Sequence, residues 1–491
     1  MRSHFCSSYV AIGLRPRHDL NPILVATAQR NLIKLPSPRL ILLFIFLQCA
    51  LLNADQKPEA FHFFGLTNLW TVELRFTASQ WKQLQAGNRA PSPDTPKSRA
   101  DDSDRNYTYS HADLRIADRI VTNVGVRLKG AGTQAGNAQE RWPFRIDLDK
   151  YAENQRIDGA SKISFNNNYY DSSYLREALS YECFRSFGVP APRTCFIKLF
   201  LSVPGSYERK YLGLYNAAEG IETQFVKSHF KDGSGLLLKP NFGLGGFPSR
   251  TDWQGLTQSL NPKNAASEAQ HQRMIDFFKL LNQSNEKLFR ENIGSFVNID
   301  EYLRFLVVNV ALVNQDSYLG MGKNYYIYLD KDSNKLNWLP WDLDLSMGGF
   351  FFCGGPRDRI ELSIDRPSSI RDPLIRRVLA VPEYRDRYHN LMRDFLAKHF
   401  DKELMFDRID LLSGIIRHAV MEEKSTRPED FARSLDGRDA TRATFQDSTL
   451  RWMLIEPGLK LFVEKRIESI QAQLAGKREG VRTGFGHVEP W

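Results

Sequence analysis

Alternation of apolar and polar positions dominates the first half of the chain. Alternation with a period of two is typical of half-buried antiparallel strands. It predicts strands in LWTVELRF (69–76), in HADLRIADRIVTNVGVRLKG and RWPFRIDLDKY (within 111–151), and in TCFIKLFLSV and RKYLGLYNAAE (within 194–219). The first half is therefore expected to form a mainly antiparallel sheet.

Helical spacing interrupts this sheet pattern twice. A short helix is expected from Ala78 to Gln85, and a longer one in DSSYLREALSYECFRSFG, residues 171–188. Asp171 or Ser172 can cap the start of the longer helix, and Gly188 can end it.

The second half of the chain reads mainly as helix. VNIDEYLRFLVVNVALVNQDSY (297–318) predicts a long, largely buried helix, and the sequence from Asp372 onward keeps a helical period. Between them, KNYYIYLD (323–330) and KLNWLPWDLD (335–344) predict a β-hairpin. We expect an α+β protein with two lobes: a sheet-rich N-terminal lobe with one helix, and a helical C-terminal lobe carrying the hairpin.

The N-terminal segment has the pattern of an export signal. LILLFIFLQCALL (40–52) is an apolar run preceded by basic residues, and it is short for a membrane-spanning helix. Residues 1–54 hold six Lys or Arg and one Asp, so they carry five of the nine net positive charges. We expect an exported protein, secreted, periplasmic or at the cell surface. An uncleaved anchor and a buried core helix are the alternatives.

The charge and the cysteines exclude some classes of function. Outside residues 1–54 there is no basic stripe interleaved with aromatic residues, so we expect no nucleic-acid partner. None of the five cysteines forms a CxxC pair, which argues against a zinc site. Buried free thiols are favoured for Cys183, Cys195 and Cys353, with a Cys183–Cys195 bridge as the alternative.

Acidic and amide side chains cluster in the stretch from 314 to 349. Asp316 falls where the helix pattern ends, Asn324 opens the first hairpin strand, and Asp342 and Asp344 close the second. A hairpin brings its two ends together, and oxygen ligands without His or Cys suit a hard ion such as Mg²⁺. On a strand, Asp342 and Asp344 would point to the same side. Turn formation and helix capping are the simpler explanations of such residues.

Basic residues flank a turn of small residues in GVRLKGAGTQAGNAQERWPFRID. Its free backbone N–H groups could meet phosphate, and Arg127, Lys129, Arg141 and Arg145 could neutralise phosphate charge. An ordinary basic hairpin is the alternative. Glu177, in the middle of the predicted helix, could pair with one of these cations or be solvated.

Several motifs together resemble the CotH kinase family, which is related to a bacterial spore coat protein kinase. They are LREALSYECFRSFGVPAPRT, YLGLYNAAEGIE, GLLLKP, NQDSY with KNYYIY, and LPWDLDLSMGG, and the likeness runs from about Asp113 to about Leu474. The resemblance implies an atypical protein-kinase-like fold that binds ATP and Mg²⁺ (or Mn²⁺) and phosphorylates Ser or Thr of proteins.

The resemblance also assigns roles to residues of this chain. Asp316 corresponds to the catalytic aspartate, and Asn324 and Asp342 correspond to metal ligands, with Asp344 as a less regular one. The turn after GVRLKG would cover the nucleotide, and Glu219 would lie near the hinge between the lobes. The phosphate-binding cation is not settled by the motif: Arg145 is the first choice, Arg141 the second, and Lys129 and Glu177 belong to the same expected nucleotide site.

We therefore divide the chain into five parts: 1–54 as signal peptide or anchor, 55–110 as a strand, a helix and a polar loop, 111–222 as the kinase-like N-terminal lobe, 223–475 as the C-terminal lobe, and 476–491 as a tail. The expected partner is a Ser-rich exported protein. We expect the protein to be a monomer and to contact the membrane only through its N-terminal segment, if that segment is not cleaved. The alternatives are a non-catalytic surface or coat scaffold with the same fold, and a carbohydrate-active protein with Asp pairs near Trp338 and Trp341.

Overall fold

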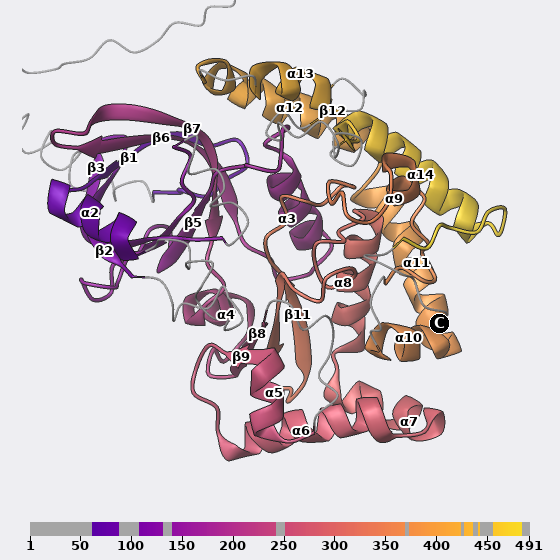
Figure 1. Cartoon of the computed structure of the whole chain (residues 1–491). Coiled ribbons are helices and arrows are strands. Elements are labelled where there is room, and N and C mark those ends of the chain that lie inside the picture. Colours follow the sequence, from indigo (N-terminus) through magenta and orange to yellow (C-terminus); the bar gives the residue numbers. More distant parts are fainter. Residues whose placement is uncertain are drawn as a thin grey trace, which may run out of the picture. The chain divides into compact units, whose positions relative to one another are not determined.

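Seven strands from the first half of the chain close into a barrel (Figure 1). Around the barrel they follow the order β1, β2, β3, β4, β5, β7, β6. The strands are β1 (Leu69–Arg75), β2 (Ser110–Ile116), β3 (Arg119–Leu128), β4 (Phe144–Asp147), β5 (Lys162–Asn166), β6 (Thr194–Val203) and β7 (Tyr207–Glu219).

The first strand closes the barrel. β1 pairs antiparallel with β2 and parallel with β6, so that Leu69 lies opposite Phe196. The α+β class and most of the barrel's strand positions were predicted, but β5, the closure and the parallel pair were not. Alternation reports which side chains face the core. It does not report which distant strand completes the sheet.

The helix of the barrel region begins later than its sequence pattern suggests. α3 spans Arg176–Ser186, because Tyr174 has a φ of +60° that no helix accommodates. Asp171 does not cap α3 from the neighbouring position. Its carboxylate accepts hydrogen bonds from the backbone N–H groups of Ser173 and Arg176 and so holds the turn before the helix. Gly188, at φ +80°, ends the helix region as predicted.

A second sheet lies beside the barrel in the order β11, β10, β8, β9. The predicted hairpin of β10 (Tyr325–Leu329) and β11 (Leu336–Pro340) is confirmed, with Tyr325 opposite Pro340. β8 (Leu236–Pro240) and β9 (Leu260–Pro262) extend it on one side. This sheet supplies one wall of the candidate site.

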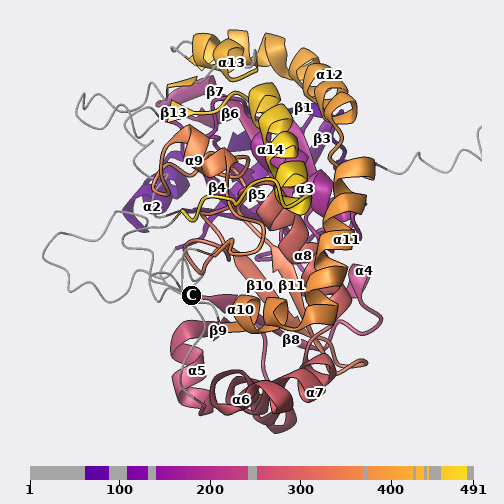
Figure 2. The ribbon, with the colours of Figure 1, turned by 90° about the vertical axis from the view of Figure 1, so that its right-hand side faces the viewer.

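Helices surround the second sheet, and α8 (Ile299–Ala311) is buried among them. α11 and α14 pack against α8, while α5, α6 and α7 lie at the far end of the sheet (Figures 1 and 2). The helices, with α2 beside the barrel, are α2 (Ala78–Gly87), α4 (Thr223–His229), α5 (Trp253–Ser259), α6 (Glu268–Gln283), α7 (Glu286–Phe296), α9 (Pro356–Ile360), α10 (Pro373–Ala380), α11 (Pro382–Lys398), α12 (Lys402–Met421), α13 (Arg427–Leu435) and α14 (Leu459–Leu474); a short ribbon joins β12 (Ala440–Thr441) to β13 (Ile455–Glu456).

This computed structural model describes residues 61–87, 108–130, 140–241, 251–368, 373–423, 427–435, 440–441 and 455–483. The apolar run at 40–52 and most of the expected nucleotide-covering turn, residues 131–139, lie outside them. Within the described ranges, no helix has the length and apolar character needed to cross a membrane. Cys183, Cys195 and Cys353 are buried free thiols, so the Cys183–Cys195 bridge is absent.

Candidate phosphotransfer site

The candidate catalytic residue lies in a tight loop after α8. The helix ends at Ala311, earlier than predicted, because Val313 takes a left-handed φ of +48°. The polar residues that follow are nevertheless buried, and Asp316 is only 7% exposed. A loop that buries polar groups must satisfy them internally. Here Ser317 donates from its hydroxyl to the carbonyl of Asn314.

Asp316 and Asn324 meet as the sequence predicted. The Asn324 side-chain amide donates to the Asp316 backbone carbonyl at 2.6 Å and to its carboxylate Oδ2 at 3.2 Å. The other carboxylate oxygen, Oδ1, lies 3.0 Å from the Nζ of Lys323. Lys323 was not singled out from the sequence, although it directly precedes Asn324. The carboxylate is thus held between a cation and an amide.

Asp342 follows the second hairpin strand and is held by a tyrosine. Its backbone N–H donates to the hydroxyl of Tyr181 on α3 at 3.0 Å, and the preceding Trp341 N–H donates to the Asn324 carbonyl at 3.1 Å. The expectation that Asp342 and Asp344 share a strand face was wrong, because β11 ends at Pro340 and Asp342 has a φ of +58°. Asn324 also has a positive φ, +57°. Such backbone conformations cluster at functional sites.

Glu177 is a buried partner of this acidic group, not a solvated helix residue. The side-chain amide of Asn166 donates to both Glu177 carboxylate oxygens at 2.7 Å, and the Asn166 Oδ1 accepts a hydrogen bond from the Nζ of Lys129. Burial, and then the charge of Asp342, raise the pKa of Glu177 to about 7, and Lys129 opposes that rise. A lysine and an amide therefore connect the barrel to Glu177, whose carboxyl lies close enough to Asp342 for its pKa to respond to that charge.

Asp344 completes the acidic group. Burial raises the pKa of its carboxyl well above the ordinary value, and the nearby charges of Asp342, Glu177 and Asp316 add to the rise. Asp342, Glu177 and Asp316 raise the pKa of Asp344 because negative charges this close together repel one another. A cation placed among them would therefore be stabilised. The sequence predicted Asp316, Asp342 and Asp344 together, and the structure adds Glu177 to them.

The donor chemistry of this group fits a hard divalent ion. Carboxylate and amide oxygens are the ligands that Mg²⁺ prefers. No set of three or more His, Cys, Asp or Glu side chains stands ready to hold a metal ion in the ranges that the structure describes. A divalent ion held at Asp342 and Asn324 would have to complete its coordination shell with water and substrate oxygens, as Mg²⁺ sites do.

A basic pocket of about 100 Å³ opens beside the acidic group, between the barrel and the second sheet. Trp341 and Tyr326 supply aromatic walls, and Trp341 directly precedes Asp342. Trp338 is fully buried, and Trp341, which is 6% exposed, belongs to a hydrophobic cluster and also lines the pocket. The charged lining residues are Arg127, Lys129, Arg145, Lys162, Lys239, Lys263 and Glu222.

The candidate phosphate-binding cations Lys129 and Arg145 differ in the contacts that they make. Lys129 lies in the pocket, with its Nζ 5.9 Å from the ring centroid of Trp341, and it contacts the Asn166–Glu177 pair. Arg145 also lines the pocket, but Ser164 and Glu222 each accept a hydrogen bond from its guanidinium at 2.9 Å. Of these two cations, Lys129 is the one linked to the acidic group, through Asn166.

Two of the expected nucleotide-site residues have other partners. Arg141 is buried and pairs with Glu423 at 2.7 Å, and its guanidinium also donates to the carbonyl of Asn167. Glu219 accepts two hydrogen bonds from the guanidinium of Arg193, at 2.8 and 3.0 Å, and one from its backbone N–H at 3.3 Å. Arg141 thus links the barrel to the segment after α12, and Glu219 pairs within the barrel at the adjoining ends of β6 and β7. The acid in the pocket is Glu222, which the sequence analysis missed although it lies in the same YNAAEGIE motif.

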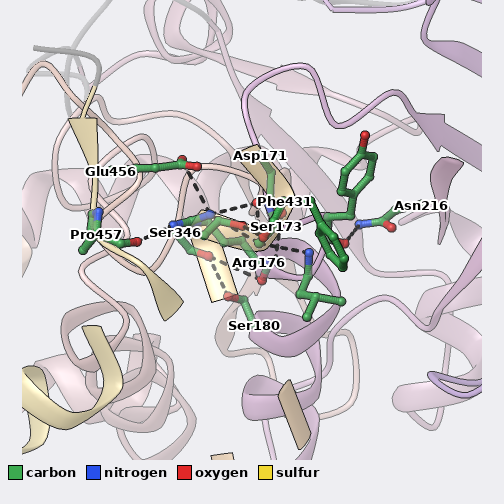
Figure 3. Close-up of polar contacts among 12 residues, drawn as sticks. Asp171, Ser173, Arg176, Ser180, Asn216, Ser346, Phe431, Glu456 and Pro457 are labelled. Atoms are coloured by element: carbon green, nitrogen blue, oxygen red, sulfur yellow. Dashed lines mark hydrogen bonds and ion pairs between the residues drawn. The ribbon is translucent and has the colours of Figure 1, made fainter. Parts of the chain in front are cut away.

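Arg176, the residue before Glu177, fixes the helix that carries both of them to other segments of the chain (Figure 3). Arg176 is fully buried and pairs with Asp171 at 2.8 Å and with Glu456 of β13 at 3.5 Å. On the same helix, the hydroxyl of Ser180 lies 2.7 Å from that of Ser346, in the loop after Asp342. Arg176 therefore stabilises the position of α3, whereas Glu177 accepts its hydrogen bonds from Asn166.

Gly320 allows the Asp316 loop to close tightly, and replacing it should disable the loop. A Cβ on this residue would lie 2.0 Å from the carbonyl oxygen of Gln315. We expect Gly320→Ala to displace Asp316 and to lower any activity that depends on this carboxylate about 100-fold. In Gly294→Ala, the added Cβ would make ordinary contact at 3.6 Å with Tyr384, so this control should keep full activity. Normal activity of Gly320→Ala would show that the loop geometry is not needed.

Comparisons with known proteins show which family the chain resembles. The chain is 26% identical over 267 residues to inner spore coat protein H of Bacillus subtilis (strain 168), which covers 54% of this chain and 70% of that protein. It is 24% identical over 262 residues to invasin CotH3 of Rhizopus delemar (strain RA 99-880), which covers 50% of this chain and 38% of that protein. The family described as CotH kinase protein matches residues 126–466, a span that contains Lys129, Glu177, Asp316 and Asp342. The chain therefore belongs to the CotH kinase protein family.

Proposed function

We propose that this chain transfers a phosphate group from ATP to a Ser or Thr hydroxyl of a protein, with a divalent metal ion at Asp342 and Asn324. One arrangement carries the proposal: the charges of Glu177, Asp316 and Asp342 all act on Asp344, and Lys129, which lines the basic pocket, is linked to Glu177 through Asn166. A cation for phosphate, acids for a metal and an acid for a hydroxyl proton are the parts that phosphoryl transfer needs.

The proposal treats the molecule as two kinase-like lobes. The barrel with α3 would be the N-terminal lobe, and the second sheet with its helices would be the C-terminal lobe. The pocket supports this division, because Lys129 and Arg145 reach it from the barrel, whereas Lys239, Tyr326 and Trp341 reach it from the second sheet. The aromatic walls suit a purine base, and the cations suit its phosphates.

Lys129 is our choice for the phosphate-binding cation. Glu177, ionised, would hold the ammonium group through Asn166 and keep it pointed at the phosphates. Asp342 and Asn324, with Asp344 behind them, would hold the metal ion. When bound, this ion supplies neutralisation of the phosphate charge.

Asp316 is our choice for the general base. Its carboxylate would accept the hydrogen bond of the acceptor hydroxyl and then its proton, while the hydroxyl oxygen bonds to the γ-phosphorus and ADP departs. Asn324 orients the carboxylate through Oδ2, and Lys323 keeps Oδ1 paired. Lys323 is also placed to meet negative charge that develops on the transferred group.

Removal of the Lys129 charge tests the nucleotide site. Binding of Mg-ATP should raise the melting temperature of the wild-type protein, because a ligand that binds only the folded state stabilises it. Lys129→Met should lose most of this rise and lower kcat/KM for transfer about 100-fold. Lys82→Met removes the same charge from an exposed site on α2 and should change neither quantity. An unchanged melting shift in Lys129→Met would move the phosphate site to another cation.

A non-catalytic surface or coat scaffold is the second candidate function. The relatives are a spore coat protein and an invasin, which supports a location outside the cell or on its surface, where ATP is scarce. Wild-type protein that shows no melting shift with Mg-ATP or Mn-ATP, and transfers no labelled γ-phosphate to co-exported Ser-rich proteins, would favour the scaffold.

A further inference from the structure

The segment that follows α14 contacts the loop of Asp316 through a side chain. Gln315, the residue before Asp316, is fully buried, and its side-chain amide donates a hydrogen bond to the hydroxyl of Thr483. Thr483 is itself only 6% exposed, although it lies far from the loop in sequence. The Oε1 atom of Gln315 has no hydrogen-bond partner in the part of the chain that the structure describes. Among the described residues, Thr483 is therefore the group that satisfies this buried amide.

Gln315 also fixes the backbone from which Asp316 projects. The Gln315 N–H donates to the carbonyl of Val313 at 3.1 Å, and its own carbonyl packs against Gly320, where a Cβ would lie 2.0 Å from the oxygen. On the other side, the carbonyl of Asp316 accepts a hydrogen bond from the Asn324 side chain at 2.6 Å. The backbone of Asp316 is thus held between these two neighbours, and a displacement of Gln315 would displace it.

The segment that carries Thr483 is held firmly against the residues after α9. The Val481 N–H donates to the carbonyl of Glu361 at 2.6 Å, and the Val481 carbonyl accepts a hydrogen bond from the Ser363 N–H at 2.8 Å. Gly480 packs so closely on Ser363 that a Cβ would lie 2.3 Å from the Ser363 Cα. A side chain at position 480 would therefore force the segment away from its place.

A buried arginine fixes α14, which leads into this segment, to the helix that precedes the loop. Arg466 of α14 is fully buried and donates to the carbonyl of Val310, near the end of α8, at 2.9 Å. It also donates to the carbonyls of Ile360 and Leu362, each at 2.8 Å. Leu362 is the residue opposite Val481 in a parallel bridge. The segment, α14 and the end of α8 are consequently fixed relative to one another.

We infer that Thr483 is a positioning residue for Asp316 and that it acts through Gln315. The inference rests on the proposed function, in which Asp316 is the general base. A base must keep its carboxylate within hydrogen-bond distance of the acceptor hydroxyl, so a small shift of the loop lowers the rate of transfer. Without the Thr483 hydroxyl, the amide of Gln315 would be buried without a partner, which is unfavourable enough to move the loop.

Thr483→Val removes the hydroxyl at nearly constant size. We expect the turnover number for phosphate transfer to fall about 10-fold or more, with an unchanged KM for Mg-ATP and an unchanged Mg-ATP melting shift, because Lys129 and Asp342 lie on other segments. Thr483→Ser keeps the hydroxyl and should keep turnover within about threefold of the wild type. Thr71→Val makes the same change at an exposed position of β1 and should alter none of these quantities.

A second variant and a second measurement cover a Thr483→Val protein that does not fold. Gly480→Ala displaces the segment from Ser363 without altering a group that contacts the loop, and it should lower turnover at unchanged KM. Hydrogen–deuterium exchange of the amides of residues 313–322 should be faster in both variants than in the wild type, because a loop that loses its contacts opens more often. Exchange in Thr71→Val should match the wild type.

The outcomes separate this inference from the proposed function. Folded Thr483→Val with wild-type turnover would overturn the inference, and so would a loss of turnover that Thr483→Ser shares or that comes with a loss of the Mg-ATP melting shift. A wild-type chain that transfers no phosphate would contradict the proposed function, and exchange at residues 313–322 would then decide whether Thr483 positions the loop. Unchanged exchange in both variants would overturn the inference in either case.

Discussion

Asp316→Asn is expected to lower the turnover number for phosphate transfer by about 10²–10⁴-fold, the range associated with loss of a general base. Binding of Mg-ATP should survive, because the substitution keeps the size of the side chain and leaves Asp342 and Lys129 in place. The amide can still meet Asn324, and Lys323 is partly exposed, so that water can solvate its unpaired charge. The measurement is single-turnover transfer of labelled γ-phosphate, alongside the melting shift caused by Mg-ATP.

The comparison with Asp342→Asn separates the base from the metal ligand. That variant should lose both transfer and most of the Mg-ATP melting shift, whereas Asp316→Asn should lose transfer alone. Asp332→Asn changes an exposed carboxylate in the turn of the same hairpin and should affect neither. Full transfer activity in Asp316→Asn would exclude Asp316 as the base.

The acidic half of the site could be predicted because its residues are close in sequence. Asp316, Asn324 and Asp342 belong to one helix-and-hairpin unit, and a hairpin joins its own ends by local geometry. Their strained backbone could not be predicted. The positive φ values of Asn324 and Asp342 depend on the hydrogen bonds that Trp341 and Tyr181 make.

Which basic residues line the pocket was harder to predict. The answer depends on the side of a barrel strand that each cation occupies and on the residues with which that cation pairs. Arg141 and Arg145 lie close in sequence, but Glu423, hundreds of residues away, binds Arg141 on one side of the barrel. Lys129 is selected by Asn166, which has no sequence motif of its own. Long-range pairs of this kind also closed the barrel through β1 and β6.

Arg176→Met is expected to lower the free energy of unfolding by about 3–5 kcal/mol, the largest stability effect that we predict. Arg176 is fully buried, and its guanidinium pairs with Asp171 and Glu456 and donates to the carbonyl of Pro457 at 2.8 Å (Figure 3). Its removal leaves two carboxylates in the interior without their cation, which costs far more than loss of a surface pair. Denaturant unfolding monitored by fluorescence measures the change.

The control for charge removal is Arg290→Met. Arg290 pairs with Glu383 where both side chains are more than half exposed, and we expect a loss of no more than about 1 kcal/mol. A loss of similar size in Arg176→Met would mean that the buried pairs contribute little to stability.

Neutralising the partners of Arg176 tests the physical reason for the loss. If uncompensated charge dominates, the triple variant Asp171→Asn, Arg176→Met, Glu456→Gln should recover a large part of the stability lost in Arg176→Met. If the hydrogen bonds and packing of the guanidinium dominate, the triple variant should be no more stable than the single one. Because α3 carries Glu177 beside Arg176, Arg176→Met should also weaken Mg-ATP binding. The triple variant should bind Mg-ATP again only if α3 returns to its native position. The same three residues thus connect the stability of the fold to the position of the Lys129–Asn166–Glu177 chain.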